Sequence, residues 1–455
     1  MAVLNALITP AHADEREAAA AVWQRLPDHL KVDEQALGRH SAGCSATYGV
    51  MEACDFKCTA CYLSDHANAT PPLPFDEVRE QLDVIRQHLG PWGNTQITAG
   101  EVTLLPCDHL IRILKYCHTI QLSAMVMTNG QTILRDPTYL TRLVIEGGLS
   151  KISIHIDTTQ KGRLGLRAKD TEKDIHWIRD AFANLIRQTR RTTGKPLAAA
   201  TTFTVTQDNF AEIPDVMAWC INNADAFRMI SFQPTADVGR TRDREQIQRQ
   251  DALWSKICAG VGQHLNPHTF LFGHPKCNQA SLMFVITFHN GRCEERHIMQ
   301  VHRPANDGDR LFFNRLMNGG FAGFSPDGEA GHLVLARILG RIRKHPKRLF
   351  DILGFTGQRL WEERAWLPRF ASAVTRGRRW SVHPFVVIVH NFMSRHELNT
   401  SEGQDRLAAC AFKVPVDGKM VSMCELNGTD MRESLNLRDQ DRLVHVVAPV
   451  REAKP

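Results

Sequence analysis

The most informative part of this sequence is the run Cys54-Asp55-Phe56-Lys57-Cys58-Thr59-Ala60-Cys61. Its cysteines have the spacing C-x3-C-x2-C and follow the first predicted strand, on the loop that enters the next helix. Thiolates are the ligands of iron–sulfur clusters, and three cysteines on one loop can converge on a cubane cluster and leave its fourth iron without a protein ligand. Cys54, Cys58 and Cys61 are therefore the predicted metal ligands of a catalytic [4Fe-4S] cluster. The alternatives are buried structural cysteines or a partial zinc site, although structural zinc usually takes four protein ligands.

The composition is that of a globular protein, with 43% hydrophobic and 23% charged residues among 455. No apolar run approaches the length of a membrane-spanning helix. The first residues lack the basic start of a signal peptide, so we expect a cytoplasmic protein. In that reducing compartment, the 12 cysteines are more often metal ligands, catalytic groups or core residues than disulfides.

Short strand-like runs alternate with helical runs through the first half of the chain. The predicted strands are 47–51, 95–100, 123–128, 152–157, 200–206 and 229–233. The predicted helices between them are 75–89, 109–119, 137–146, 174–190 and 211–222. Alternation of this kind favours βαβ units and a parallel sheet. Six units fit a partial (β/α)6 TIM-like barrel, whereas an open doubly wound sheet would show the same alternation.

The faces of the predicted strands favour the barrel. Side chains alternate across a strand, and one face of 152–157 carries Ser153, His155 and Asp157 whereas the other carries isoleucines. A parallel strand covered by helices on both faces should be apolar on both. A repeatedly polar face therefore predicts an inner surface that lines a ligand cavity. Antiparallel strands with one solvated face are the alternative.

After residue 233 the alternation ends and a C-terminal extension of β-hairpins and helices is predicted. Asn290-Gly291 and Asp417-Gly418 are strong hairpin turn signals. The predicted divisions are a helical extension (1–44), the barrel (45–240), a helical and hairpin region with a basic block (241–380) and a hairpin domain (381–455).

On these residues the chain resembles the radical S-adenosylmethionine (SAM) superfamily, over roughly residues 45–240. The superfamily carries C-x3-C-x2-C after the first strand of a partial barrel. The resemblance implies that the open iron chelates SAM and that an electron from the cluster breaks its sulfonium C–S bond. It further implies that the resulting 5′-deoxyadenosyl radical takes a hydrogen atom from substrate. The cofactor carries this chemistry, and the protein supplies position and exclusion of water.

The resemblance extends to the strand ends that follow, where it implies SAM-binding residues. The stretch 98–101 is similar to a Gly-Gly-Glu motif that contacts the SAM amine, with Ala99 in place of the first glycine. Ligands at the carboxyl ends of barrel strands also fit the general rule. The family often has an aromatic residue before the third cysteine, where this chain has Ala60. The implied cofactor-binding residues are Gly100, Glu101, Thr128, Asn129, Ser153, His155 and Asp157.

A second iron–sulfur cluster is predicted in the C-terminal extension. Cys410 and Cys424 flank the Asp417-Gly418 hairpin, which brings them nearly opposite each other. Cys277 lies in a turn-rich setting, and Cys44, Cys293 or a non-cysteine group is a candidate fourth ligand. Ordinary buried cysteines are the alternative.

The run 410–427 is similar to a subgroup that includes the archaeal tetraether lipid synthases. Members have a cysteine, a short Asp-Gly hairpin, a second cysteine and a nearby asparagine, as Cys410, Cys424 and Asn427 do here. The zinc-ribbon-like N-terminal part of that subgroup is missing or reduced to Cys44.

A basic block is predicted to face an anionic partner. Residues 331–380 carry 12 Lys or Arg and 3 Asp or Glu, a local charge of +9 that leaves −3 for the rest of the chain. The mixture of Leu, Ile, Phe and Trp with arginine suits a helix on an anionic lipid surface, peripheral to the membrane. A helical subdomain with a solvated basic face is the alternative, and nucleic acid ranks lower because aromatic residues are not regularly interleaved.

The predicted function is reductive cleavage of SAM to a radical that abstracts hydrogen from a substrate, with a lipid as the candidate substrate. A flavodoxin or ferredoxin would supply the electron. The alternatives are a peptide maturase with an auxiliary cluster and a non-catalytic iron–sulfur or zinc protein. No catalytic residue beyond the cluster ligands is assigned from the sequence.

Overall fold

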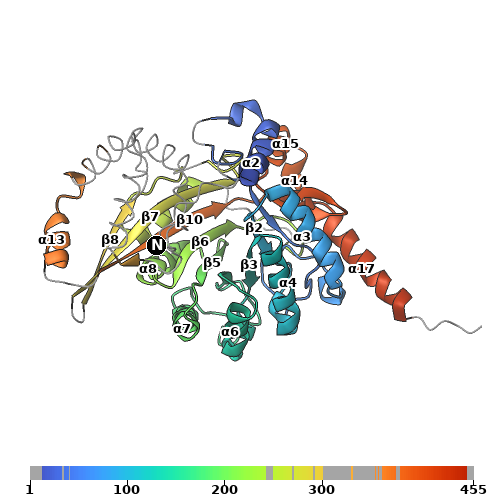
Figure 1. Cartoon of the computed structure of the whole chain (residues 1–455), viewed down its shortest axis with the longest axis horizontal. Coiled ribbons are helices and arrows are strands. Elements are labelled where there is room, and N and C mark those ends of the chain that lie inside the picture. Colours follow the sequence, from blue (N-terminus) through green and yellow to red (C-terminus); the bar gives the residue numbers. More distant parts are fainter. Residues whose placement is uncertain are drawn as a thin grey trace, which may run out of the picture.

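The computed structural model describes residues 13–32, 35–39, 41–241, 250–268, 271–290, 293–300, 329–330, 354, 357, 361–375 and 380–447. Its centre is one curled mixed sheet with helices packed along its outer face (Figure 1). Most of the predicted basic block, including the predicted lipid-facing helix, lies outside the described residues.

Six parallel strands form the barrel and pair in chain order. They are β1 (Cys44–Ala46), β2 (Asn94–Ile97), β3 (Ser123–Thr128), β4 (Lys151–His155), β5 (Ala198–Val205) and β6 (Phe227–Pro234). The predicted α/β class and partial TIM-like barrel are confirmed. The first predicted strand was wrong: the chain turns at Gly49, whose φ of 69° is left-handed, so residues 47–51 form a loop and β1 lies just before it.

Helices alternate with these strands. They are α3 (Phe75–Leu89), α4 (Cys107–Thr119), α5 (Gln131–Arg135), α6 (Pro137–Ile145), α7 (His176–Thr193) and α8 (Ile213–Asn222). Local signals set their ends. Asp136 caps α6 by accepting a hydrogen bond from Thr138 N at 3.0 Å, and Pro137 occupies the first helical position. Gly194, with φ of 64°, ends α7. The N-terminal helix α2 (Ala13–Arg25) lies within the predicted helical extension.

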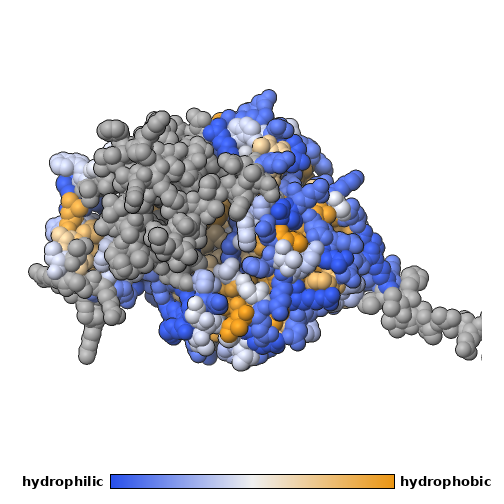
Figure 2. Space-filling model, in the orientation of Figure 1, coloured by the Kyte–Doolittle hydropathy of each residue, from blue (hydrophilic) through white to orange (hydrophobic). Residues whose placement is uncertain are grey.

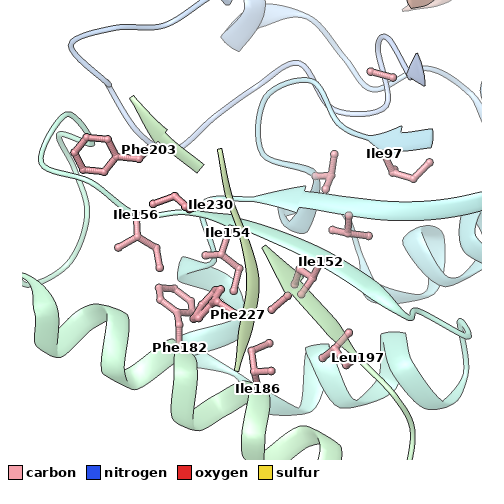
Figure 3. Packing of buried hydrophobic residues seen from close by; sticks show 14 of the residues in the cluster. Ile97, Ile152, Ile154, Ile156, Phe182, Ile186, Leu197, Phe203, Phe227 and Ile230 are labelled. Carbon is pink, nitrogen blue, oxygen red and sulfur yellow. The ribbon is translucent and has the colours of Figure 1, made fainter. Parts of the chain in front are cut away.

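The core lies between the strands and the outer helices. Ile152 and Ile154 of β4 are fully buried and point toward Phe182 and Ile186 of α7 (Figure 3). Burying each of these side chains stabilises the fold by about 1.5–3 kcal/mol. The opposite faces of the strands are polar, as predicted, and line a cavity described below.

The C-terminal extension joins the same sheet. It contributes β7 (Asn278–Asn290), β8 (Cys293–Gln300), β9 (Glu329–Ala330), β10 (Trp380–His390), β11 (Phe412–Val416) and β12 (Lys419–Ser422). Its helices are α9 (Gln250–Val261), α13 (Leu367–Thr375), α14 (Arg395–Leu398), α15 (Ser401–Ala408), α16 (Met423–Gly428) and α17 (Met431–Val447). Both predicted hairpins are confirmed, and Asp417 and Gly418 have φ of 46° and 75°, as a two-residue hairpin turn requires. The four predicted divisions of the chain stay predictions.

The sheet curls, so that the two ends of its run of parallel strands approach each other. β10 lies beside β6 and β11 lies beside β1, so they occupy opposite ends of the parallel run. Nevertheless Gly273, which precedes β7 on the β10 side, packs so closely on the chain before β11 that an added Cβ would lie 2.5 Å from the Ala409 carbonyl oxygen. We call this junction the seam.

The surface visible in Figure 2 is largely hydrophilic where residues are described. Apolar exposure occurs around α13, where Trp361 and Leu367 are 70% and 37% exposed. None of the helices in the described ranges combines the length and the hydropathy that crossing a membrane requires.

Candidate active site

A cavity of about 230 Å³ opens at the carboxyl ends of the barrel strands. Sites for small ligands typically span roughly 300 to 1,000 Å³, so this space suits one small molecule. Residues 54–61, which we call the cysteine loop, border it on one side. The inward-facing side chains of four strands line it, as their alternation predicted: Gln96, Thr98, Ser153, His155, Thr202, Thr204 and Gln233.

The end of β2 holds the segment that leads into the cysteine loop. Gly100 N donates to the Met51 carbonyl at 2.8 Å, and Glu101 N donates to the Ala53 carbonyl at 2.9 Å. A Cβ on Gly100 would lie 2.2 Å from the Glu52 carbonyl oxygen, closer than any real contact. The glycine is therefore required because two backbones touch at this point. Tyr62 adds a third tie, since its hydroxyl donates to the Ala99 carbonyl at 2.5 Å.

Glu101 joins β2 to β3 beneath the cavity. Its buried carboxylate accepts hydrogen bonds from Thr103 N at 3.0 Å, Thr128 Oγ1 at 2.6 Å and Asn129 N at 2.5 Å. Burial raises the pKa of Glu101, although these donors oppose the rise. Glu101 borders the cavity as the sequence predicted, but protein donors already occupy its carboxylate oxygens. Its role in binding SAM stays a prediction.

The end of β3 holds the cysteine loop through Asp55. Asn129 Nδ2 donates to Asp55 Oδ1 at 2.7 Å, and Gln131 N donates to Asn129 Oδ1 at 2.8 Å. Thr128 and Asn129 both line the cavity. These two predicted residues thus stand between the cavity and the loop, and Asp55 is a site residue that the spacing of cysteines did not reveal.

The end of β4 carries a histidine–aspartate pair. His155 Nε2 lies 2.5 Å from Asp157 Oδ2 and 3.1 Å from Thr204 Oγ1. Asp157 is fully buried and also accepts from Thr159 N at 2.9 Å. Burial opposes ionisation of Asp157, but His155 and these donors hold its pKa below the usual range. Ser153 and His155 line the cavity, whereas Asp157 stands behind His155 and orients it.

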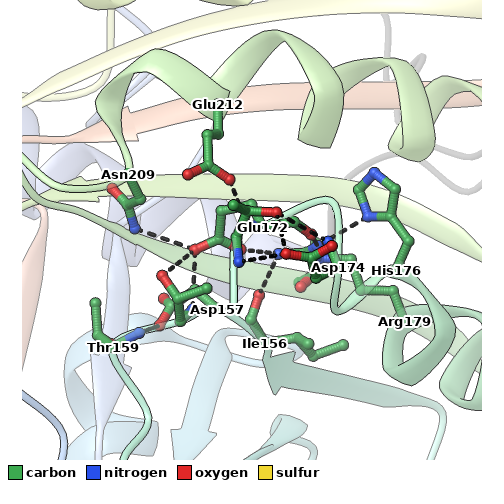
Figure 4. A network of polar contacts seen from close by, with 12 residues as sticks. Ile156, Asp157, Thr159, Glu172, Asp174, His176, Arg179, Asn209 and Glu212 are labelled. Atoms are coloured by element: carbon green, nitrogen blue, oxygen red, sulfur yellow. Dashed lines mark hydrogen bonds and ion pairs between the residues drawn. The ribbon is translucent and has the colours of Figure 1, made fainter. Parts of the chain in front are cut away.

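A buried network supports the loop after β4 (Figure 4). Glu172 accepts from Thr158 N at 2.9 Å and pairs with the buried guanidinium of Arg179. This loop in turn holds the cysteine loop, since Lys57 N and Thr59 N donate to the carbonyls of Lys161 and Thr159 at 2.8 and 2.9 Å.

Gln160 lies in the same loop and is fully buried at the edge of the cavity. Its Oε1 accepts from Arg163 Nε at 3.0 Å and Asp157 N at 3.3 Å. Its Nε2 has no hydrogen-bond partner among the described residues. A buried donor without a partner is costly, so this amide suits a ligand with an acceptor. Nothing in the sequence singled out Gln160 or Arg163.

The segment after β6 also holds the cysteine loop. Cys61 N donates to Thr241 Oγ1 at 2.6 Å, and Arg240 N donates to the Cys61 carbonyl at 2.9 Å. The ends of β2, β3, β4 and β6 therefore all fix the cysteine loop. Only the first three of these strand ends carried a motif in the sequence.

The three loop thiols face the cavity without a disulfide partner. Burial raises the pKa of Cys54 to about 12 and that of Cys58 well above its usual range, and the neighbouring thiols add to both effects. No group of three or more His, Cys, Asp or Glu side chains in the described residues is already drawn together around one metal ion. That is consistent with a cubane cluster, because each of its thiolates binds a different iron. Three convergent thiols, no competing disulfide and a bordering cavity fit such a cluster.

The last described helix, α17, contacts residues on both sides of the cysteine loop. Arg432 of α17 pairs with the fully buried Glu52 at 3.0 Å, and Tyr48 donates to Asp439 at 2.9 Å. Ser64 Oγ and Asn436 Oδ1 are 2.5 Å apart. These partners are more than 370 residues apart in sequence, and no motif predicted them.

Cys277, Cys410 and Cys424, which we call the seam cysteines, come together at the junction of β10 and β11. Asn391 N donates to the Cys277 carbonyl at 2.8 Å, and Met393 N donates to Cys424 Sγ at 3.4 Å. Burial raises the pKa of Cys424 to about 12, and the adjacent Cys410 and Cys277 thiols raise it further. The three predicted residues are thus near one another, but no group of three ligating side chains in the described residues is placed to hold one metal ion, and the second cluster stays a prediction.

The two cysteines named as candidate fourth ligands differ in position. Cys293 opposes Asn290 at the far end of β7, which begins beside Cys277 and runs for 13 residues, about 40 Å. Cys44 is half-buried in β1, pairs with Phe412 of β11, and donates from its N to the Ala411 carbonyl at 2.8 Å. Cys44 therefore lies next to Cys410 and stays a candidate ligand.

Comparisons with known proteins give partial likenesses. No family model matches the sequence. The chain is 23% identical over 206 residues to the 7,8-dihydro-6-hydroxymethylpterin dimethyltransferase of Methanocaldococcus jannaschii, which covers 45% of this chain and 38% of that relative. The chain therefore spans well under half of that relative's length.

Two solved structures are similar over part of the chain. One is anSMEcpe with bound AdoMet, at 13% identity and a TM-score of 0.32 over 42% of this chain and 50% of that one. The other is Streptococcus suis SuiB bound to S-adenosylmethionine, at 14% identity and a TM-score of 0.29 over 52% and 44%. Likeness at this level carries no inference about the chemistry of this chain.

Proposed function

We propose that this protein is a radical SAM enzyme in which Cys54, Cys58 and Cys61 hold a [4Fe-4S] cluster. The observation that carries the proposal is a loop of three thiols fixed to the ends of four parallel barrel strands and facing one small cavity. When bound, the cluster and SAM would supply a 5′-deoxyadenosyl radical that takes a hydrogen atom from substrate.

The chain's own residues would position and shield these groups. Gly100 fixes the backbone that leads into the loop and Asn129 holds the Asp55 side chain within it, so the thiols keep one geometry. Gln160 offers its unpartnered Nε2 to an acceptor of the ligand, and His155, oriented by Asp157, stands on the same wall. Phe392, Phe412 and Met423 also border the cavity and would exclude water.

We further propose a second iron–sulfur cluster on Cys277, Cys410 and Cys424. Its support is that residues 391–393 join two of these cysteines, since Asn391 N donates to the Cys277 carbonyl at 2.8 Å and Met393 N donates to Cys424 Sγ at 3.4 Å. An electron donor of the flavodoxin or ferredoxin type would serve the catalytic cluster.

A lipid is the proposed substrate class, and a cytoplasmic protein that binds the membrane surface is the setting it implies. Its support is the apolar wall of the cavity and the basic composition of residues 331–380. The peptide substrate of a maturase is the alternative. Adding lipid vesicles or a peptide mixture to a SAM-cleavage assay separates them, because the true substrate should accelerate cleavage.

The main test is anaerobic. The protein is reconstituted with iron and sulfide, then given SAM and dithionite, and 5′-deoxyadenosine is measured by mass spectrometry. Wild type should form it, and the Cys54→Ala/Cys58→Ala/Cys61→Ala variant should form none. A Cys117→Ala/Cys220→Ala variant, which removes two buried cysteines of outer helices, should retain activity. Equal product from wild type and the triple variant would refute the proposal.

A further inference from the structure

The segment 161–177, which follows β4, packs directly against the cysteine loop. A Cβ added to Gly162 would lie 3.4 Å from the Asp55 carbonyl oxygen. The buried Arg163 places its guanidinium 5.1 Å from the ring centroid of Phe56, which separates two of the loop cysteines in the sequence. Anything that binds to the exposed side of this segment is therefore close to the loop thiols.

Two large apolar side chains of the segment are exposed. Leu164 is 58% exposed and Trp177 is 55% exposed. Gly165 has a φ of 83°, and a Cβ there would lie 2.5 Å from the Trp177 ring. The indole thus lies on the backbone immediately beside Leu164. Exposed apolar side chains that gather in this way mark interaction sites, and tryptophan is a frequent anchor in protein interfaces.

Basic side chains surround this apolar pair. Five that are exposed belong to the segment or to the cysteine loop beside it: Lys57, Lys161, Arg167, Lys169 and Lys173. They outnumber the three acidic side chains of residues 55–57 and 161–177 that are not buried, Asp55, Asp170 and Asp174. We call the five basic residues, Leu164 and Trp177 the donor surface. Its excess of positive charge favours an acidic partner.

The network beneath the segment keeps the donor surface in one shape (Figure 4). Glu172 and Arg179 form an ion pair that is buried on both sides, and Asn209 Nδ2 donates to Glu172 Oε1 at 3.3 Å. Asp174 accepts from Thr171 N at 2.9 Å and closes a turn of the segment. A preorganised surface loses little conformational freedom when a partner binds.

We propose that the donor surface docks an acidic one-electron carrier protein of the flavodoxin or ferredoxin type, which reduces the cluster held by the cysteine loop. The inference rests on the proposed function and deepens it by assigning the electron donor a binding site. With a flavodoxin, the flavin hydroquinone is oxidised to the semiquinone and the cluster gains that one electron. Because electron transfer slows steeply with distance, a surface in contact with the cysteine loop suits this partner.

The experiment measures binding of a purified bacterial flavodoxin, reduced to the hydroquinone, to the reconstituted full-length protein by anaerobic isothermal titration. Arg167→Glu/Lys169→Glu/Lys173→Glu should raise the Kd about 10-fold or more at low salt, because it replaces attraction by repulsion. High salt should narrow the difference. Trp177→Ala should raise the Kd about 10-fold at both salt concentrations, since its contribution is apolar.

The matched control changes the net charge equally at another place. Lys115→Glu/Arg191→Glu/Lys195→Glu reverses three exposed basic side chains of the outer helices and their ends. Arg191 and Lys195 lie at the far end of α7, about 27 Å from Trp177 along the helix. This variant should bind flavodoxin as wild type does.

Stopped-flow absorbance then measures reduction of the cluster. At subsaturating flavodoxin, both donor-surface variants should be reduced about 10-fold more slowly than wild type, in line with their weaker binding. Dithionite needs no docking surface, so it should reduce wild type and all variants at the same rate. Equal dithionite rates also show that the variants are folded and carry an intact cluster.

Each other outcome overturns a defined part of the inference. Wild-type flavodoxin affinity in both donor-surface variants refutes the docking surface and leaves the proposed function intact, because SAM cleavage with dithionite does not depend on it. An equal loss in the control variant shows a general effect of charge and refutes the site. Lost binding to anionic lipid vesicles with unchanged flavodoxin affinity assigns the surface to a membrane instead. A protein that takes up no iron refutes the proposed function, and this inference with it.

Discussion

The cysteine loop and the seam are two thiol groups of the same size that the chain builds in opposite ways. The loop takes its three cysteines from eight consecutive residues, 54–61, whereas the seam takes one each from 277, 410 and 424. The loop is fixed mainly by backbone hydrogen bonds from strand ends. The seam is fixed by where two edges of the curled sheet meet and by one buried arginine.

The difference shows when the spacing of cysteines in the sequence predicts that their thiols converge, and when only the topology of the fold can show it. Spacing within one loop limits how far apart three thiols can be, so a motif predicts their convergence. Thiols from distant segments converge only if the sheet closes, and each then depends on the stability of every connecting element. The seam should therefore be lost first under stress, and the following predictions test that order.

The largest effect is expected at the ion pair that joins α17 to Glu52, just before the cysteine loop. Arg432→Ala leaves Glu52 buried without its partner, which should cost about 3–5 kcal/mol in the free energy of unfolding. The measurement is urea denaturation. Arg442→Ala is the matched control, since its pair with Glu77 is 49% and 41% exposed and should contribute less than about 1 kcal/mol. Equal losses would contradict the assigned burial.

Gly100→Ala should move the cysteine loop. Because the new Cβ would meet the Glu52 and Ala53 carbonyls at 2.2 and 2.4 Å, we expect 5′-deoxyadenosine formation to fall about 100-fold. Gly418→Ala is the control. Its φ of 75° is also left-handed but nothing lies within 4 Å, so it should cost about 1 kcal/mol and leave SAM cleavage unchanged. Full activity of Gly100→Ala would show that the loop tolerates displacement.

Acid should lower the stability of the strands β7 and β10, which lie on one side of the seam. Burial, helped by Arg228, Arg190 and His289 and opposed by Asp225, lowers the pKa of His383 on β10 to about 3. The unfolded chain therefore takes up a proton below the ordinary pKa of 6.5 while the native His383 stays neutral, so stability is lost as pH falls.

At pH 5 this histidine should cost the native state about 2 kcal/mol relative to pH 8. His383→Phe should remove that part of the pH dependence, as measured by urea denaturation at both pH values. Hydrogen exchange should show β7 and β10 opening more readily in acid than the residues around the cysteine loop. An unchanged pH slope in His383→Phe would contradict the buried neutral state.

Gln160→Leu should weaken SAM binding about 10-fold, near 1.4 kcal/mol, because its Nε2 would no longer meet an acceptor of the ligand. Isothermal titration of the reconstituted protein measures this, and iron content should stay at the wild-type value. Gln404→Leu, which removes an amide from the surface helix α15, is the control and should bind SAM normally. Wild-type affinity in Gln160→Leu would exclude it from the binding wall.

The smallest effect on stability is expected from the loss of a helix cap, and it distinguishes the seam cysteines from those of the loop most directly. Thr400 caps α15, which carries Arg406, by accepting from Gly403 N at 2.9 Å, and Thr400→Ala should cost about 1 kcal/mol. Asp136→Ala removes the cap of α6 at a similar cost. Both should lower the melting temperature, but only Thr400→Ala should reduce the iron bound at the seam.

The sequence predicted the barrel because its signals are local. Alternating polar and apolar residues in 152–157 assigned Ser153 and His155 to the cavity and the isoleucines to the core, as the structure has them. The first strand was misplaced because residues 47–51 are β-prone while Gly49 forces a turn. Tertiary geometry overrode local propensity at that point.

The parts of the site that were missed have no local signal. Gln160, Arg163 and Thr241 became site residues only because the ends of several strands meet. Arg432 reaches Glu52 across 380 residues of sequence, a distance that no pattern spans. The seam cysteines were proposed from a hairpin and a turn, but the arginine beside them required the fold.

The contacts of α17 with residues on both sides of the cysteine loop also dictate an order of events during synthesis. The loop leaves the ribosome well before α17, because Arg432 and Asn436 follow it by more than 370 residues. Until then Glu52 lacks its buried partner and neither β10 nor β11 flanks the barrel. Contacts of such long sequence separation form late and slowly. The nascent chain thus presents three unshielded thiols until α17 has been synthesised, and the finished thiol pocket forms only after that.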